Sequence, residues 1–168
     1  MLPTPGHTRG HVVFRDQEAG ALFAGDHVLP HITPSIGFEA APAAMPLRDY
    51  IGSLRTVRAL PDMTLLPAHG PVAESVHTRV DELLAHHDDR LSACMDTVTA
   101  GATTAYESAC ILTWTRRERH FDELDTFSQM LAVNETAAHL DLLAAQERIS
   151  SFTEAGVTRY AAIQPPPG

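Results

Sequence analysis

Short apolar runs separated by turn-forming residues characterise the first part of the chain. The segments HVVFRD (residues 11–16) and ALFAGD (residues 21–26) flank QEAG, a pattern that predicts two strands joined in a hairpin. Pro46 suits the first position of a helix, and the apolar residues that follow recur at helical spacing up to Leu60. MTLLPAHGPV (residues 63–72) predicts a strand ending in a Pro/Gly loop, and the Pro-, Ala- and Gly-rich residues 27–45 predict an irregular loop.

From residue 74 onward the pattern is mainly helical. Apolar residues from Val80 to Val98 mark one face of a long helix that ends at Gly101, and Thr104 is a suitable cap for a second helix. A third helix is predicted from the apolar residues Phe127, Met130, Leu131, Ala138, Leu142 and Leu143. RISSFTEAGVTRYAAI (residues 148–163) predicts two strands around a turn, before an extended PPPG tail. We therefore expect two domains, 1–73 and 74–168, the second winged-helix-like.

Composition narrows the class of protein. The chain of 168 residues has a formal net charge of −9, and all 12 of its basic residues are arginine. Such a charge disfavours a dedicated nucleic-acid binder, because phosphates are attracted by excess positive charge. No apolar run is long enough to span a bilayer and no signal peptide is recognisable, so we expect a cytoplasmic protein without a membrane partner. The only cysteines, Cys94 and Cys110, fit a reducing compartment.

Three polar residues follow or precede apolar strands in loops. They are His7 in TPGHTRGH, Asp26 in LFAGDHVLP and His69 in LLPAHGPV. Loops at strand ends can bring such side chains together, and imidazole with carboxylate suits zinc, iron or manganese. The competing interpretation is that the histidines cap backbone groups and that Asp26 starts a turn.

Other histidines lie close to these residues in the sequence. His11 is expected to orient its neighbours by hydrogen bonding rather than to bind a metal itself. His27 and His31 belong to the loop that follows Asp26. Three interpretations stay open for them: contact with substrate, replacement of missing metal ligands, or simple exposure.

The three motifs, in this order, resemble the metallo-β-lactamase superfamily, in particular its branch of hydrolases with a C-terminal winged-helix-like domain. The resemblance implies an α+β chain formed by the second half of an αββα sandwich and a mainly helical domain. It implies that His7 and His69 each bind one of two divalent ions, with zinc as the expected metal, and that Asp26 bridges them as the catalytic carboxylate. Ala68 stands where the family has a glycine. The implied activity is hydrolysis of a thioester, lactone or phosphodiester by a metal-activated water.

The sequence departs from the family in one respect. The motif His-x-His-x-Asp-His, which supplies further metal ligands in the family, does not occur here. Because a catalytic zinc needs about three protein ligands, one histidine and a shared carboxylate per ion are too few. We therefore expect the C-terminal portion of such an enzyme, inactive by itself, from a truncated or wrongly started gene or a split protein. Whether this chain is an enzyme stays open.

The missing half of the sandwich has a second consequence. We expect an exposed apolar sheet face formed by Val12, Phe14, Leu22 and Leu65, and therefore self-association or docking on a complementing chain. The alternative function is a non-catalytic remnant that binds a partner chain through this face. A transcription regulator is the least favoured class, since the third helix carries Glu135 and Asp141 and has no arginine before Arg148.

Overall fold

The computed structural model describes residues 1–115 and 117–163, so the predicted PPPG tail lies outside the described residues. The chain divides into two compact units, Met1–Asp88 and Asp89–Gly168. This division falls inside a long helix, whereas the domain boundary predicted from the sequence lies before that helix. Among the described residues, no helix combines the length and apolar character needed to cross a membrane.

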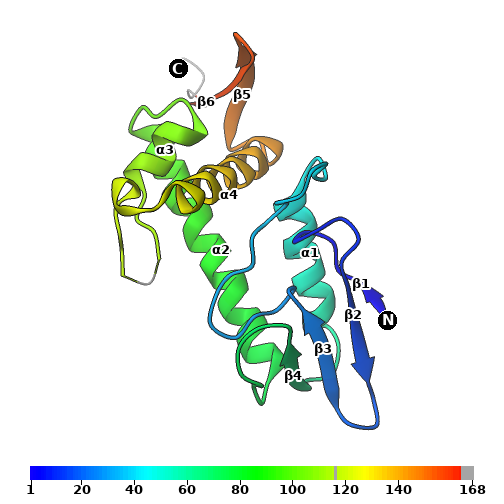
Figure 1. Ribbon diagram of the computed structural model, residues 1–168. Coiled ribbons are helices and arrows are strands. Elements are labelled where there is room, and N and C mark those ends of the chain that lie inside the picture. The colour runs from blue at the N-terminus through cyan, green and yellow to red at the C-terminus, as the bar shows by residue number, and fades with distance from the viewer. Residues whose placement is uncertain (116, 164–168) are drawn as a thin grey trace. The chain divides into compact units, whose positions relative to one another are not determined.

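The first unit contains a four-stranded sheet in the order β1-β2-β3-β4 (Figure 1). The strands are β1 (Leu2–Pro3), β2 (Val12–Asp16), β3 (Ala21–Gly25) and β4 (Thr64–Pro67). β2 is antiparallel to both β1 and β3, while β3 and β4 are parallel. The predicted hairpin and the predicted strand within residues 63–72 are confirmed. The two-residue β1 was not predicted, because so short a segment has no periodicity.

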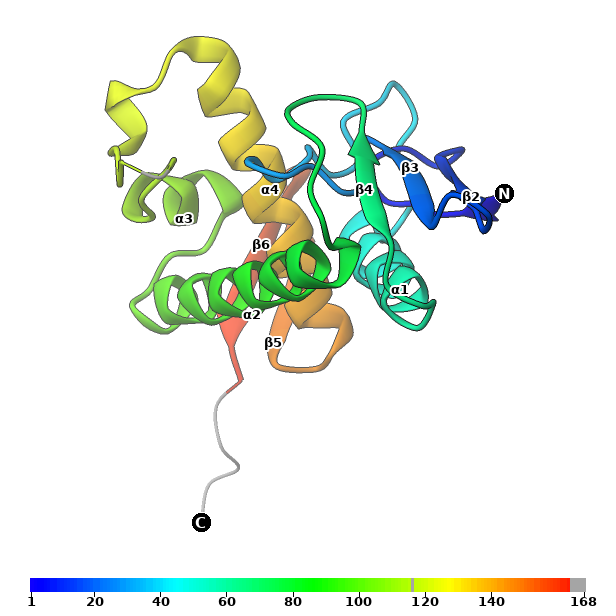
Figure 2. The same ribbon diagram turned by 90° about the horizontal axis from the view of Figure 1, so that it is seen from below.

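Helix α1 (Pro46–Arg58) runs along one face of the sheet (Figure 2). It buries Leu47, Tyr50, Leu54 and Val57, and on the sheet Leu22 and Leu65 are completely buried. The expectation that Leu22 and Leu65 form an exposed face is therefore wrong, because both side chains are packed in the interior of the unit. The opposite face is the open one: Phe14 and Phe23, paired across β2 and β3, are 53% and 50% exposed.

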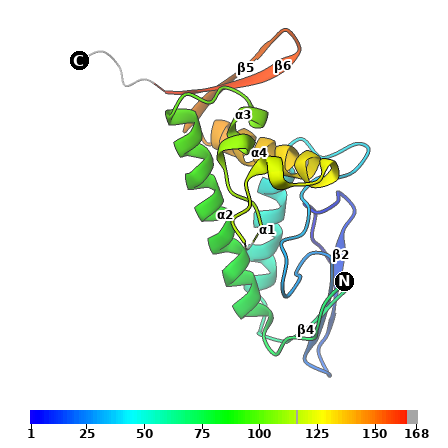
Figure 3. The same ribbon diagram turned by 60° about the vertical axis from the view of Figure 1, so that its left-hand side comes forward.

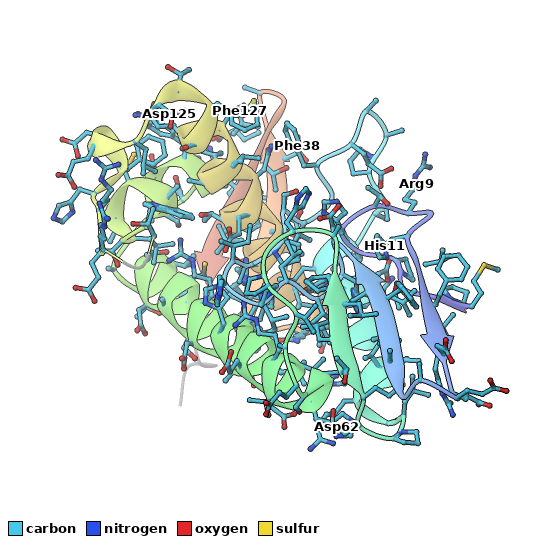
Figure 4. All side chains as sticks on the ribbon, turned by 60° about the horizontal axis from the view of Figure 1, so that its bottom comes forward. Arg9, His11, Phe38, Asp62, Asp125 and Phe127 are labelled. Carbon is cyan, nitrogen blue, oxygen red and sulfur yellow. The ribbon has the colours of Figure 1, made fainter. Side chains whose placement is uncertain are left out.

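The long helix α2 (Val76–Thr99) begins in the first unit. The hydroxyl of Ser75 accepts a hydrogen bond from the Thr78 amide at 3.0 Å, and the Asp62 carboxylate accepts one from the His77 amide at the same distance. Both satisfy amides of the first helical turn, which have no partner within the helix. Figure 4 shows Asp62 at the end of the sheet opposite to Arg9 and His11.

The second unit contains the rest of α2, helices α3 (Ala105–Ile111) and α4 (Thr126–Ala145), and a hairpin of β5 (Ile149–Glu154) and β6 (Val157–Ala162) (Figure 3). These elements were predicted. A short 3-10 helix, Phe121–Glu123, was not. Thr104 caps α3 through a reciprocal pair with Glu107, as expected, and Asp125 caps α4. Together with the first unit this confirms a mixed α+β chain.

The core of the second unit uses only part of the apolar residues that predicted its last helix. Among the apolar residues that predicted α4, Phe127 and Met130 are 55% and 43% exposed, and the buried positions begin at Ala132. Between α2 and α3, the carbonyl of Thr103 accepts a hydrogen bond from the Tyr160 amide of β6 at 2.9 Å. The hairpin is thereby attached to the segment between the two helices.

The two cysteines of the second unit are expected to differ in reactivity. Cys94 is buried, which raises the pKa of its thiol to about 12, and Cys110 is exposed. Because the thiolate is the nucleophile, a reagent at pH 8 should modify Cys94 about a thousandfold more slowly than a free thiol, until the unit unfolds. Mass spectrometry of labelled peptides measures both rates, with Cys110→Ser as the control. Rapid labelling of Cys94 in the folded chain would contradict the burial.

Candidate metal centre

The strand directions explain how the three predicted residues meet. β3 and β4 are parallel, with Gly25 opposite Pro67, so Asp26 and His69 leave the sheet at the same edge. β2 runs in the opposite direction, so the loop that precedes it, with His7, starts at that edge too. The Ala68 amide donates to the Gly25 carbonyl at 3.0 Å and extends the contact between β3 and β4 up to the two side chains.

The Asp26 carboxylate lies between the two histidines and offers a different oxygen to each. Asp26 Oδ1 is 3.5 Å from His69 Nε2, and Asp26 Oδ2 is 3.9 Å from His7 Nε2. The three side chains therefore come together as the sequence analysis expected. The exposure of their side chains differs, since His69 is 73% exposed and His7 is 22% exposed.

The ring of His7 has a defined tautomer. Its Nδ1 lies 2.8 Å from the carbonyl oxygen of Ser35, which can only accept a hydrogen bond, so Nδ1 carries the proton. In the neutral ring, Nε2 then presents its lone pair toward Asp26. A histidine held in this way by a carbonyl on its other nitrogen is the usual state of a metal ligand.

The distances fit a shared ion in each pair. Two donors at about 2.0–2.1 Å from a tetrahedral zinc stand about 3.4 Å apart. The separation of His69 Nε2 and Asp26 Oδ1 is close to this value, and that of His7 Nε2 and Asp26 Oδ2 is somewhat wider. Among residues 1–115 and 117–163, no group of three or more His, Cys, Asp and Glu side chains is arranged to hold an ion by itself. The residues thus fit part of a metal centre.

His11 lies behind the candidate ligands. Its Nδ1 is 2.8 Å from the Thr4 hydroxyl, and its ring meets that of His7 edge to face, with the centroids 6.0 Å apart. Burial lowers the pKa of His11, with a further contribution from the charge of His7. A Cβ atom added at Gly25 would lie only 2.8 Å from His11 Nε2, so the glycine makes room for the ring. These contacts support the predicted orienting role.

His27 is completely buried, which excludes simple exposure as its interpretation. Its ring lies 5.9 Å from that of His11 and 5.1 Å from that of Tyr50, and neither ring nitrogen has a hydrogen-bond partner among the described residues. Burial lowers the pKa of His27 to about 3, so the ring is neutral near pH 7. His31, by contrast, is exposed on the loop of residues 27–45.

Two residues of the first unit that support this edge were not predicted from the sequence to do so. The buried Tyr50 of α1 donates its hydroxyl hydrogen bond to the His27 carbonyl at 2.8 Å. Gly6 packs so closely on Tyr50 that an added Cβ would overlap its backbone. Gly6 has φ of +136°, a conformation that favours glycine, and the PG pair before His7 was the only local signal.

Comparison with known proteins places this arrangement in a family context. Residues 1–69 match the family model of the metallo-beta-lactamase superfamily. The probable metallo-hydrolase YqjP of Bacillus subtilis is 26% identical over 168 residues, which cover 98% of this chain and 50% of YqjP. A lactamase-like protein, nscB of Arthroderma gypseum, is 38% identical over 96 residues, or 57% of this chain and 28% of nscB.

Two solved structures are similar over 95% of the chain. A beta-lactamase domain protein from Burkholderia ambifaria has a TM-score of 0.81 and 33% identity, and the match covers 46% of it. A metallo-beta-lactamase family protein from Thermus thermophilus has a TM-score of 0.77 and 29% identity, with 48% covered. The chain thus spans about half the length of these proteins and of YqjP. Together, the family model, the relatives and the solved structures support membership of this chain in the metallo-beta-lactamase superfamily.

Proposed function

We propose that this chain contributes His7, Asp26 and His69 to the metal centre of a metal-dependent hydrolase that acts on a thioester, lactone or phosphodiester. The observation that carries the proposal is the Asp26 carboxylate, whose two oxygens face different histidines at 3.5 and 3.9 Å. A carboxylate placed in this way suits a bridge between two ions. When bound, zinc supplies Lewis-acid activation of water and of the electrophilic carbonyl or phosphorus.

The roles of the chain's own residues follow from their contacts. Asp26 supplies the negative charge that two cations share. His7, fixed by the Ser35 carbonyl, directs Nε2 to one side of the carboxylate, and His69 directs its Nε2 to the other. One histidine and half of a carboxylate are fewer than the roughly three protein ligands of a catalytic zinc. The remaining ligands are proposed to come from polypeptide other than residues 1–168.

The open face of the sheet supports this proposal. Phe14 and Phe23 are paired across β2 and β3, and both are about half exposed. Adjacent exposed phenylalanines at the centre of a sheet favour contact with another apolar surface. We propose that the polypeptide that supplies the remaining ligands packs there.

The second unit is proposed to be winged-helix-like and to serve packing rather than DNA reading. In support, α2, α3 and α4 precede the β5–β6 hairpin, and Tyr160 of β6 donates its amide to the Thr103 carbonyl between the first two helices. The carboxylate of Asp141 on α4 accepts a hydrogen bond from the Tyr160 hydroxyl at 2.7 Å. An acidic side chain engaged within its own unit does not favour groove binding by α4.

Metal binding by the purified, tag-free chain tests the proposal. Asp26→Ala removes the donor shared by both histidines, so we expect the affinity for Zn²⁺, measured by calorimetry and by metal content, to fall more than roughly a hundredfold. Asp16→Ala is the matched control, because Asp16 accepts hydrogen bonds from backbone amides of the β2–β3 turn. It should bind Zn²⁺ as the unaltered chain does.

Two results would overturn the proposal. Equal Zn²⁺ binding by the Asp26→Ala and Asp16→Ala variants would show that Asp26 is not the shared ligand. Turnover of an ester or phosphodiester by the chain alone, with stoichiometric metal and loss on chelation, would contradict the need for ligands from elsewhere.

A further inference from the structure

We propose that Arg79 is a positioning residue for the metal centre and that it acts on His69 through the loop of residues 27–45, here named the connecting loop. This inference rests on the proposed function, because it assigns the residue that holds one of the proposed ligands in place. Neither Arg79 nor the connecting loop is among the proposed ligands.

Arg79 lies in the first turn of α2 and uses its guanidinium to hold the connecting loop. Its Nε donates to the Leu29 carbonyl at 2.6 Å and its Nη2 donates to the Ile32 carbonyl at 3.0 Å. The remaining nitrogen, Nη1, pairs with Glu82 at 2.8 Å, and only 13% of the side chain is exposed. Hydrogen bonds from a charged, largely buried donor are stronger than neutral ones, so this contact is a firm attachment.

Pro30, one of the two residues between the carbonyl acceptors, contacts the loop that carries His69. A Cβ atom added at Gly70 would lie 2.8 Å from Cγ of Pro30 and 3.4 Å from its Cδ. Pro30 therefore packs directly against the backbone of the residue that follows His69. Arg79 thus fixes Leu29 and Ile32, and Pro30 between them supports Gly70.

His69 has the greatest need of such support. Its side chain is 73% exposed. The side chain of His7 is only 22% exposed, and its Nδ1 is hydrogen-bonded to the Ser35 carbonyl. The middle of the connecting loop is attached to the His7 loop, since the Gly37 amide donates to the Gly6 carbonyl at 2.9 Å. The connecting loop therefore touches both histidine loops, and Arg79 holds the end that lies beside His69.

Three variants separate positioning from general stabilisation. Arg79→Ala removes the attachment, Arg79→Lys keeps the charge but cannot reach both carbonyls as a fork, and Arg58→Ala is the matched control. Arg58 also contacts α2, through Asp81 at 2.7 Å and His77 at 3.0 Å, and both of these partners lie outside the connecting loop. Pro30→Ala serves as a second test, because it removes the ring from Gly70 and leaves Arg79 intact.

Hydrogen exchange of the metal-free chain gives the first result. In Arg79→Ala, we expect exchange in residues 28–33 and 66–72 to become about tenfold faster, with residues 35–37, β2 and β3 unchanged and partial recovery in Arg79→Lys. Pro30→Ala should accelerate hydrogen exchange in residues 66–72 alone. Arg58→Ala should leave the exchange rates of both segments unchanged. The inference would be overturned if exchange became faster to the same extent throughout the unit. It would also be overturned if exchange in residues 66–72 stayed unchanged in either Arg79→Ala or Pro30→Ala.

Zn²⁺ affinity gives the second result. Arg79→Ala should lower it roughly 10- to 100-fold, and the loss should vanish in a His69→Ala background, since the residue acts through His69. An equal further loss in that background would contradict the inference. Equal Zn²⁺ affinity of the unaltered chain and of Asp26→Ala would defeat the proposed function, while hydrogen exchange would still decide whether Arg79 positions the His69 loop.

Discussion

Replacement of Gly6 by alanine is expected to lower the free energy of unfolding of the first unit by roughly 3–5 kcal/mol, through backbone strain and steric overlap. Gly6 has φ of +136°, which a side chain disfavours. Tyr50 also occupies the space that a Cβ atom at Gly6 would need. An added Cβ would overlap Cα and Cβ of Tyr50 and come within 2.6 Å of its amide nitrogen. Because backbone cannot swing away as a side chain does, the loop before His7 must move as a whole.

Gly10→Ala is the matched control for this prediction. It lies in the same loop, and an added Cβ would meet no atom within 4 Å. Urea unfolding followed by far-ultraviolet circular dichroism measures both variants. Fluorescence of the single tryptophan, Trp114, reports on the second unit and should show an unchanged transition there. Similar stability of the two variants would contradict the close packing of Gly6 on Tyr50.

Much of the fold could be predicted because it depends on local patterns. The β2–β3 hairpin follows from two short apolar runs and a Gly-ended turn, and the start of α3 from Thr104 as its cap. Local patterns do not tell which of two apolar faces is covered. Leu22 and Phe23 are neighbours on opposite faces of β3, and only the three-dimensional packing of the unit buries Leu22 and leaves Phe23 exposed.

The candidate site likewise combines residues that a local sequence pattern predicts with residues that it does not. His7, Asp26 and His69 could be predicted because each belongs to a short motif at a strand end, and the structure brings them together. The residues that hold them could not, since their partners are distant in the sequence. Arg79 contacts Leu29 across 50 positions, and Ser35 contacts His7 across 28. Such contacts form through carbonyl oxygens, which every residue has, so the sequence of the acceptor carries no signal.

Replacement of Tyr50 by alanine should have an effect as large as that of Gly6→Ala, about 3–5 kcal/mol, since it removes a fully buried aromatic ring. The ring packs edge to face against His27 and His87, at centroid distances of 5.1 and 5.4 Å. Its loss also leaves the His27 carbonyl without the hydroxyl donor. Tyr50→Phe, which keeps the ring, should cost only about 1–3 kcal/mol, the range for an unsatisfied buried acceptor.

Tyr106→Ala is the control, because Tyr106 of α3 is 60% exposed, and the loss of its edge-to-face contact with Phe121 should lower stability by no more than about 1.5 kcal/mol. The two Tyr50 variants also test whether the core supports the proposed metal centre. The His27 carbonyl accepts the Tyr50 hydrogen bond, and His27 follows Asp26 directly in the chain. Tyr50→Phe should therefore weaken Zn²⁺ binding more than its modest loss of stability alone would, because the backbone beside Asp26 loses its attachment to α1. If Tyr50→Phe and Tyr106→Ala bind Zn²⁺ equally well, Tyr50 supports only the fold, and the backbone of Asp26 is held by the sheet alone.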